Sequence, residues 1–200
     1  MTKRIGIYLY PDVEVLDFAG PFEVFKTANR VALRLRPNQE PPFAVTTIAR
    51  GAGLVLARGG LPVQPDVTLD TTPLPDVLIV PGGVVDNELA DERLMDWLRS
   101  AATHAQIMAS VCTGAFILAK AGLLNDRPIT THWEDIPDLR RMFPALDVRE
   151  NVRWVDDGDV VTAAGISAGI DMSLHLVARL AGQELAERTA RQMEYMWNKG

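Results

Sequence analysis

The strongest constraint on the fold is an apolar run at 76–80 (DVLIV) that ends directly at Pro81-Gly82-Gly83. A second run, QIMASV at 106–111, has the same character. Strands that do not alternate between apolar and polar residues are typical of a parallel sheet covered by helices on both faces. Apolar residues at helical spacing separate the two runs, as a parallel crossover requires. The two runs therefore predict neighbouring central strands.

The remaining elements are expected to alternate in the same way. We predict strands at 4–10 and 43–49, short strands or turns over 53–69, and a strand pair around an Asp-Gly turn within 152–163. We predict helices from about Pro21, after a turn at Gly20-Pro21, and over 87–102, 113–121, 134–142, 168–181 and 183–197. The expected fold class is α/β. It comprises one domain over residues 1–200, built as a three-layer sandwich with a mostly parallel central sheet flanked by helices.

Composition limits the classes of function. The chain is 48% hydrophobic and 23% charged, as ordinary globular proteins are, which excludes general disorder. Its net charge of −6 disfavours binding to nucleic-acid phosphates, so we expect no nucleic-acid partner. The chain has no apolar run long enough for a membrane span, and the apolar stretch near its N-terminus is too short for the hydrophobic region of a signal peptide. A single cysteine excludes an intrachain disulfide framework and indicates a cytoplasmic location.

Cys112 is the main candidate functional residue. It follows the strand predicted at 106–111 and precedes Thr113-Gly114, where a helix is expected to begin. A side chain at such a sharp turn faces the carboxyl edge of the sheet, like the serine of the hydrolase elbow. The N–H groups at a helix N-terminus favour thiolate, so we predict a lowered thiol pKa and a catalytic nucleophile. The alternative is a buried, inert cysteine.

Asp17 places a carboxylate in the apolar segment 15–21. Desolvation there would raise its pKa and suit it to proton transfer near neutral pH. From spacing alone, however, capping of the following helix is favoured, because Asp is a good N-cap. Glu23 lies six residues on, and we expect a surface charge or a salt-bridge partner.

Gly82 and Gly83 directly follow a predicted strand. Glycine allows close approach of the backbone, so their N–H groups are candidates for stabilising charge on a substrate near Cys112. A plain tight turn is the alternative. The small-residue loop 165–169 likewise fits either close packing of a helix or crowding of the cysteine site.

The three histidines show no spacing typical of metal ligands, and we predict no metal site. His104 is expected at a helix end, and His175 in a structural role. His132 lies 20 residues past Cys112 and either lines the pocket or is structural. Neither a G-x-G-x-x-G nor a Walker pattern is present, so no cofactor is expected.

Several blocks together resemble one family. They are SVCTGAFILAKAGLL (110–124), ITTHW (129–133), VLDFAGPFEVF (15–25), LIVPGG (78–83) and AGISAGIDMSLHLVARLAG (164–182). The chain resembles the ThiJ/PfpI superfamily, in the branch that holds isocyanide hydratases and the sensor domains of AraC-type regulators. The resemblance implies a flavodoxin-like sandwich of the kind found in class I glutamine amidotransferases.

The resemblance also implies an activity, that of an isocyanide hydratase-like hydro-lyase. In that mechanism Cys112 attacks the terminal isocyanide carbon, Asp17 handles protons, and water releases an N-substituted formamide from a thioimidate. Residues expected to bind the small-molecule substrate are Thr113, Gly82, Gly83 and His132. A homodimer is implied by the same likeness.

Two alternatives stay open. The first is a ligand-sensing domain, for which we expect no DNA-binding region in this chain, since it ends soon after the last predicted helix. The second is a glyoxalase- or deglycase-like activity. In several relatives of that kind a His follows the cysteine, whereas Thr113 follows Cys112 here, which argues against it.

Overall fold

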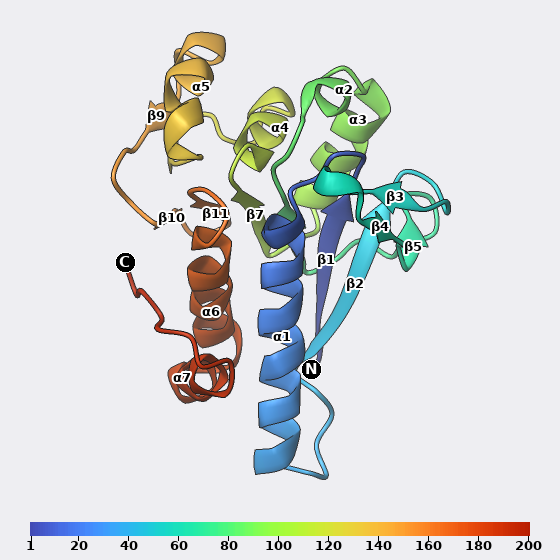
Figure 1. The fold of residues 1–200 in the computed structure, drawn as a ribbon, viewed down its shortest axis with the longest axis vertical. Coiled ribbons are helices and arrows are strands. Elements are labelled where there is room, and N and C mark those ends of the chain that lie inside the picture. Colours follow the sequence, from blue (N-terminus) through green and yellow to red (C-terminus); the bar gives the residue numbers. More distant parts are fainter.

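Strands and helices alternate along most of the chain (Figure 1), as its apolar patterning predicts. The computed structural model describes residues 1–200. The strands are β1 (Lys3–Leu9), β2 (Phe43–Ala49), β3 (Val55–Leu56), β4 (Pro62–Val63), β5 (Val67–Thr68), β6 (Val77–Val80), β7 (Ile107–Val111), β8 (Pro128–Ile129), β9 (Asp147–Val148), β10 (Trp154–Asp156) and β11 (Val160–Ala163). The α-helices are α1 (Val15–Leu35), α2 (Asp86–Leu89), α3 (Glu92–Ala102), α4 (Gly114–Lys120), α5 (Ile136–Met142), α6 (Ala168–Ala181) and α7 (Gln183–Gln192). Short 3-10 helices cover Arg58–Gly60 and Trp133–Asp135.

Seven strands form the central sheet, in the order β10-β11-β7-β6-β1-β2-β5. Every neighbouring pair is parallel except β10 and β11, which pair antiparallel around the predicted Asp-Gly turn. The pairs β3–β4 and β8–β9 lie outside this sheet. The predicted α/β class and the mostly parallel sheet are therefore confirmed.

Helices cover both faces of the sheet, which makes the predicted three layers. On one face α1, α6 and α7 pack against one another (Figure 1), and Gly169 of α6 lies against Val111 of β7. On the other face α3 and α4 pack together, and Met108 of β7 lies beside Leu123, which follows α4. Because Met108 and Val111 are three residues apart on one strand, their side chains point to opposite faces.

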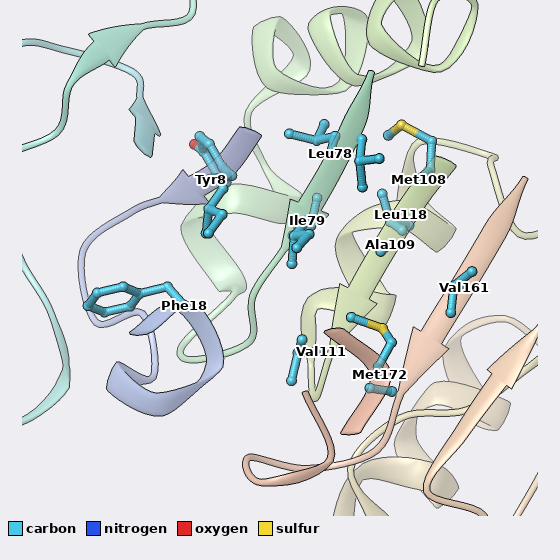
Figure 2. Packing of buried hydrophobic residues seen from close by; sticks show 14 of the residues in the cluster. Tyr8, Phe18, Leu78, Ile79, Met108, Ala109, Val111, Leu118, Val161 and Met172 are labelled. Atoms are coloured by element: carbon cyan, nitrogen blue, oxygen red, sulfur yellow. The ribbon is translucent and has the colours of Figure 1, made fainter. Parts of the chain in front are cut away.

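A hydrophobic core fills the space between these layers. Figure 2 shows side chains of β6, β7 and β11 directed into it, among them the fully buried Leu78, Ile79 and Val161. Burying one such side chain contributes about 1.5–3 kcal/mol to folding. The core therefore fixes the carboxyl ends of β1, β6 and β7 beside one another, where the candidate site residues lie.

The start of α1 differs from the prediction. The helix begins at Val15, so the expected turn at Gly20-Pro21 is wrong and Pro21 lies inside the helix. Proline there has no N–H for the carbonyl of Asp17, four residues earlier. The helix persists because its inner face is packed, with Gly20 so close to Ile170 of α6 that a Cβ would lie 3.0 Å from its Cγ1.

Two other helix boundaries also differ. The single helix expected over 87–102 is divided into α2 and α3, because the Asp91 side chain caps α3 by accepting the Leu94 N–H at 3.2 Å. The last helix ends at Gln192 rather than Trp197. Beyond it the backbone turns through Glu194, with a φ of 50°, and the C-terminal segment runs back along α6 (Figure 1).

Candidate active site

Cys112 occupies the predicted sharp turn between β7 and α4. Its φ is 55°, a left-handed conformation that costs a residue with a Cβ about 1 kcal/mol or more. Hydrogen bonds hold the backbone on both sides. The Cys112 N–H donates to the carbonyls of Ala163 and Ala164, each at 3.1 Å, and its carbonyl accepts the Thr131 hydroxyl at 2.8 Å. The surrounding strands therefore fix a strained turn that directs the thiol into a pocket.

Two backbone N–H groups, of Thr113 and Ile166, are directed at the Cys112 sulfur. Ile166 also has a left-handed backbone, with a φ of 46°. Its neighbour Gly165 lies so close to His132 that a Cβ would be 2.0 Å from the ring Cδ2. The small-residue loop thus crowds the cysteine site, which favours the second of the two interpretations left open above. Sequence reasoning did not single out Ile166 itself.

The thiol pKa is raised, contrary to the prediction. Burial is the largest cause and, together with the negative charge of Asp17, brings the pKa of Cys112 to about 12. Only 8% of the residue is exposed. The N–H groups of Thr113 and Ile166 lower the pKa, but they do not offset the loss of water. Cys112 is therefore a neutral thiol near pH 7 and needs a base to become a nucleophile.

Asp17 is fully buried in the first turn of α1 and is not its N-cap, a position that Glu14 occupies. Its Oδ2 accepts the Gly82 N–H at 3.0 Å. Its Oδ1 is buried and accepts no well-formed hydrogen bond. The Cys112 thiol is the donor that lies next to this carboxylate. Burial raises the pKa of Asp17 to about 7, although the Gly82 N–H and the thiol both lower it. The capping interpretation is thus wrong, and the carboxyl is poised to exchange a proton near neutral pH.

Gly82 and Gly83 hold the site together from the end of β6. The Gly83 N–H donates to the Thr113 hydroxyl at 2.9 Å, and that hydroxyl donates to the Gly83 carbonyl at 3.0 Å. A Cβ on Gly82 would lie 2.6 Å from the Thr113 nitrogen, so only glycine fits. With the Gly82 N–H bound to Asp17, both N–H groups predicted to stabilise substrate charge are engaged within the protein. A substrate-binding role for these glycines stays a prediction.

His132 lies at the same site, next to Asp135. Its Nδ1 is 3.1 Å from Asp135 Oδ2, but the contact lacks hydrogen-bond geometry and Nδ1 is buried without another partner. One ligating atom from each of Cys112, His132 and Asp135 lies within 4.8 Å of the other two. Sequence reasoning missed Asp135, although its separation of three residues from His132 places both on one side of a helical turn.

A pocket of about 740 Å³ opens over the thiol. Its wall includes Cys112, Thr113, Gly83, His132 and Ile166. The volume is typical of a small-molecule site. A second cavity, of about 760 Å³, lies between α1 and α7 and is lined mainly by charged side chains. It contains none of the candidate catalytic groups, so the pocket over Cys112 is the candidate active site.

The other titratable candidates are structural. Glu23 forms an exposed ion pair with Arg30 at 2.8 Å, as predicted. His175 stacks on Trp154 with ring centroids 4.0 Å apart. His104 lies just beyond α3, against the Arg4 guanidinium.

Comparisons with known proteins agree with this architecture. Residues 3–179 match the model of the DJ-1/PfpI family. The isonitrile hydratase of Pseudomonas putida is 36% identical over 196 residues, which cover 98% of this chain and 79% of that protein. The HTH-type transcriptional regulator CdhR of Pseudomonas aeruginosa is 30% identical, over 96% of this chain but only 55% of the regulator.

A solved structure gives the same result. The crystal structure of a ThiJ/PfpI family protein from Pseudomonas syringae matches with a TM-score of 0.84 and 30% identity, covering 99% of this chain and 77% of that one. Family model, sequence relatives and fold all agree with the motifs around Cys112. The chain therefore belongs to the DJ-1/PfpI family.

Proposed function

We propose that this protein is an isocyanide hydratase-like enzyme, which adds water to an isocyanide and releases an N-substituted formamide. The observation that carries the proposal is the pairing of the buried Cys112 thiol with Asp17, whose second oxygen has no other donor. The 36% sequence identity to the isonitrile hydratase of Pseudomonas putida supports the same reaction class.

In the first step Asp17 acts as the base. The raised pKa of Cys112 and the pKa of about 7 for Asp17 mean that thiol and carboxylate coexist just above neutral pH. Asp17 takes the thiol proton as sulfur bonds to the terminal carbon of R–NC. It then returns this proton to the same carbon, which gives the thioimidate R–N=CH–S–Cys112 and regenerates the carboxylate.

In the second step the carboxylate takes a proton from water as the water oxygen bonds to the thioimidate carbon. Asp17 passes this proton to the imine nitrogen and then takes the proton of the new hydroxyl group as the carbon–sulfur bond breaks, which leaves R–NH–CHO. The departing sulfur accumulates negative charge, which the N–H groups of Thr113 and Ile166 stabilise. Asp17 returns the hydroxyl proton to sulfur, and the site regains its starting state.

The shape of the pocket supports a small substrate. Val84, Phe116 and Met142 supply apolar wall around the opening, where the R group would lie. Because the thiol is buried at the base, a thin, linear isocyanide group reaches it more easily than a branched electrophile does.

The test is turnover of an aryl isocyanide, followed by loss of substrate and by chromatographic detection of the formamide. Cys112→Ala should lose at least about a thousandfold in kcat/KM, since it removes the nucleophile. The wild-type kcat/KM should rise as pH increases through about 7, where Asp17 ionises, and Asp17→Asn should abolish this rise. Glu23→Gln, at an exposed ion pair, is the matched control. Near-wild-type turnover in a folded Cys112→Ala variant would contradict the proposal.

A ligand-sensing role is the second candidate, favoured by the similarity to the regulator CdhR. It predicts saturable binding of a small molecule in the Cys112 pocket with no turnover. A thiol that still reacts with an alkylating probe while isocyanide remains unconsumed would favour this role. Lactate formed from methylglyoxal in a Cys112-dependent manner would instead indicate the glyoxalase-like alternative.

Several expectations remain predictions. They are the homodimer, the cytoplasmic location and the lack of a nucleic-acid partner. For the membrane, none of the helices combines the length and apolar character that a bilayer crossing demands.

A further inference from the structure

Three side chains of different chemistry meet at the base of the pocket. Cys112 comes from the elbow after β7, His132 from the turn after β8, and Asp135 from the 3-10 helix that follows. One ligating atom of each lies within 4.8 Å of the other two. Thiolate, imidazole and carboxylate are the ligands that proteins use for Zn²⁺.

The geometry is close to that of a tetrahedral site. Zinc–ligand bonds of about 2.0–2.3 Å place neighbouring ligand atoms about 3.3–3.8 Å apart. The His132 Nδ1 to Asp135 Oδ2 distance is 3.1 Å, already near one edge of such a tetrahedron. The Cys112 sulfur lies within 4.8 Å of a ligating atom of each of the other two residues. All three residues line the pocket, so a metal held by them would have a position accessible from it, as in zinc sites that keep an open position.

An unsatisfied atom gives independent support. His132 Nδ1 is buried and has no hydrogen-bond partner, even though Asp135 is beside it. A buried polar atom without a partner costs free energy, of the order of 1–3 kcal/mol. Coordination of a metal ion by its lone pair would remove that cost.

The charge around the site also favours a cation. Five acidic residues and two arginines line the pocket. The arginines pair with Glu14 and Asp138, at 3.5 and 2.6 Å. Asp86, Glu134 and Asp135 are then left without an arginine partner, so the pocket is net negative.

We propose, against the expectation from sequence of no metal site, that Cys112, His132 and Asp135 form a binding site for Zn²⁺ or a similar divalent cation. Binding replaces the thiol proton, which is released to solvent, with a sulfur–metal bond. The occupied sulfur is then no longer available as a nucleophile, so the metal acts as a reversible block of the pocket. The inference concerns the residues of the proposed active site, but metal binding itself does not depend on isocyanide hydration.

The test uses Co²⁺ as a spectroscopic substitute for Zn²⁺ on the purified full chain. The wild type should bind one Co²⁺ per chain, with a sulfur-to-cobalt charge-transfer band in the near ultraviolet, and Zn²⁺ should displace it. Cys112→Ser should lose the band. His132→Asn and Asp135→Asn should each weaken binding by more than about tenfold, because loss of an outer-shell partner alone typically costs about 10–100-fold.

Matched controls separate ligation from general charge. His104→Asn removes an imidazole away from the pocket and should bind Co²⁺ as the wild type does. Asp138→Asn removes a pocket acid that is not a ligand, so it should weaken binding only slightly, through charge, and keep the cobalt band. Asp17→Asn should keep the cobalt band while isocyanide turnover falls and loses its pH dependence, which distinguishes failure of the metal site from failure of the hydratase proposal. Circular dichroism checks that each variant is folded. Absence of the sulfur–cobalt band in the wild type, or unchanged affinity in folded His132→Asn and Asp135→Asn, would overturn the inference.

Discussion

Asp17 and Cys112 show how burial reverses what local sequence suggests about ionisation. The N–H groups at a helix N-terminus usually lower the thiol pKa of a cysteine that lies just before the helix. Here the loss of water and the nearby carboxyl outweigh those donors and raise the thiol pKa to about 12. The same burial raises the pKa of Asp17. At rest the proton therefore stays on sulfur, and the two groups that exchange it are 95 residues apart in the chain.

Asp17→Asn should stabilise the protein at high pH but not at low pH. An unfolded Asp titrates near its ordinary pKa of about 3.9, whereas the folded Asp17 has a pKa of about 7. The stability that Asp17 contributes is complete below about pH 4 and is lost as pH rises to about 7. Asparagine stays neutral at every pH. The free energy of unfolding of the variant, relative to that of the wild type, should therefore increase over this pH range by at most about 4 kcal/mol.

Urea unfolding at a series of pH values between 4 and 8 measures this difference. Glu23→Gln serves as the control, because the Glu23 carboxylate is half exposed and its ion pair with Arg30 lies at the surface. A free-energy difference between Asp17→Asn and wild type that does not change with pH would show that the Asp17 pKa is ordinary in the folded state.

At the scale of elements, the elbow depends on how closely α4 approaches the end of β6. Gly114 begins α4, and a Cβ there would lie 2.0 Å from the carbonyl oxygen of Val80. That neighbour is backbone at the centre of the sheet and cannot move aside. The seven-residue helix α4 can therefore lie this close to β6 only because residue 114 is glycine.

Gly114→Ala should therefore destabilise the fold by several kcal/mol, in the range of the most damaging single substitutions. Gly51→Ala, where a Cβ would meet nothing within 4 Å, should change stability by less than about 1 kcal/mol. Thermal unfolding of the two variants beside wild type makes the comparison. Equal melting temperatures for both would show that α4 is free to shift.

The same scale shows which elements the sequence could predict. The apolar runs at β6 and β7 have a single plausible structure, so the strands and the elbow between β7 and α4 follow directly. The start of α1 did not follow, because Pro21 resembles a helix start and only contact with Ile170 of α6 shows otherwise. The partners of Asp17 and of His132 also arise from tertiary contacts, and no local pattern contains them.

At the scale of the whole molecule, Asp171 joins three distant parts of the chain. It is buried on α6, where its carboxylate accepts the Arg153 guanidinium at 2.8 Å and the Asn198 N–H at 2.9 Å. Its backbone carbonyl accepts the Trp197 indole N–H at 3.1 Å. One side chain thus fixes the approach to β10 and the C-terminal segment against the same helix.

Asp171→Ala should lower the free energy of unfolding by about 2–3 kcal/mol. Breaking a fully buried ion pair by removing one partner costs about 3–5 kcal/mol. The cost should be smaller here, because a third of the Arg153 side chain is exposed to water. The C-terminal segment should also become more sensitive to protease, as measured by limited proteolysis and mass spectrometry. Glu184→Ala breaks only the exposed pair with Arg188 and should cost less than about 1 kcal/mol. Unchanged proteolysis in Asp171→Ala would show that packing and the Trp197 hydrogen bond hold the segment without the Asp171 side chain.

The strand order has a consequence for how the protein behaves at high concentration. Long, flat outer strands present rows of unused N–H and C=O groups on which other chains can grow into aggregates. Here the outermost strands, β5 and β10, contain two and three residues, and Trp154 of β10 is covered by His175. The apolar strands β1, β6 and β7 lie inside it, where they are already paired on both sides. Strand β2 meets β5 only at its last two residues, and the side chains of Asn29 and Asp66 bind part of its remaining edge. The sheet is therefore a poor template for amyloid-like growth so long as it stays folded.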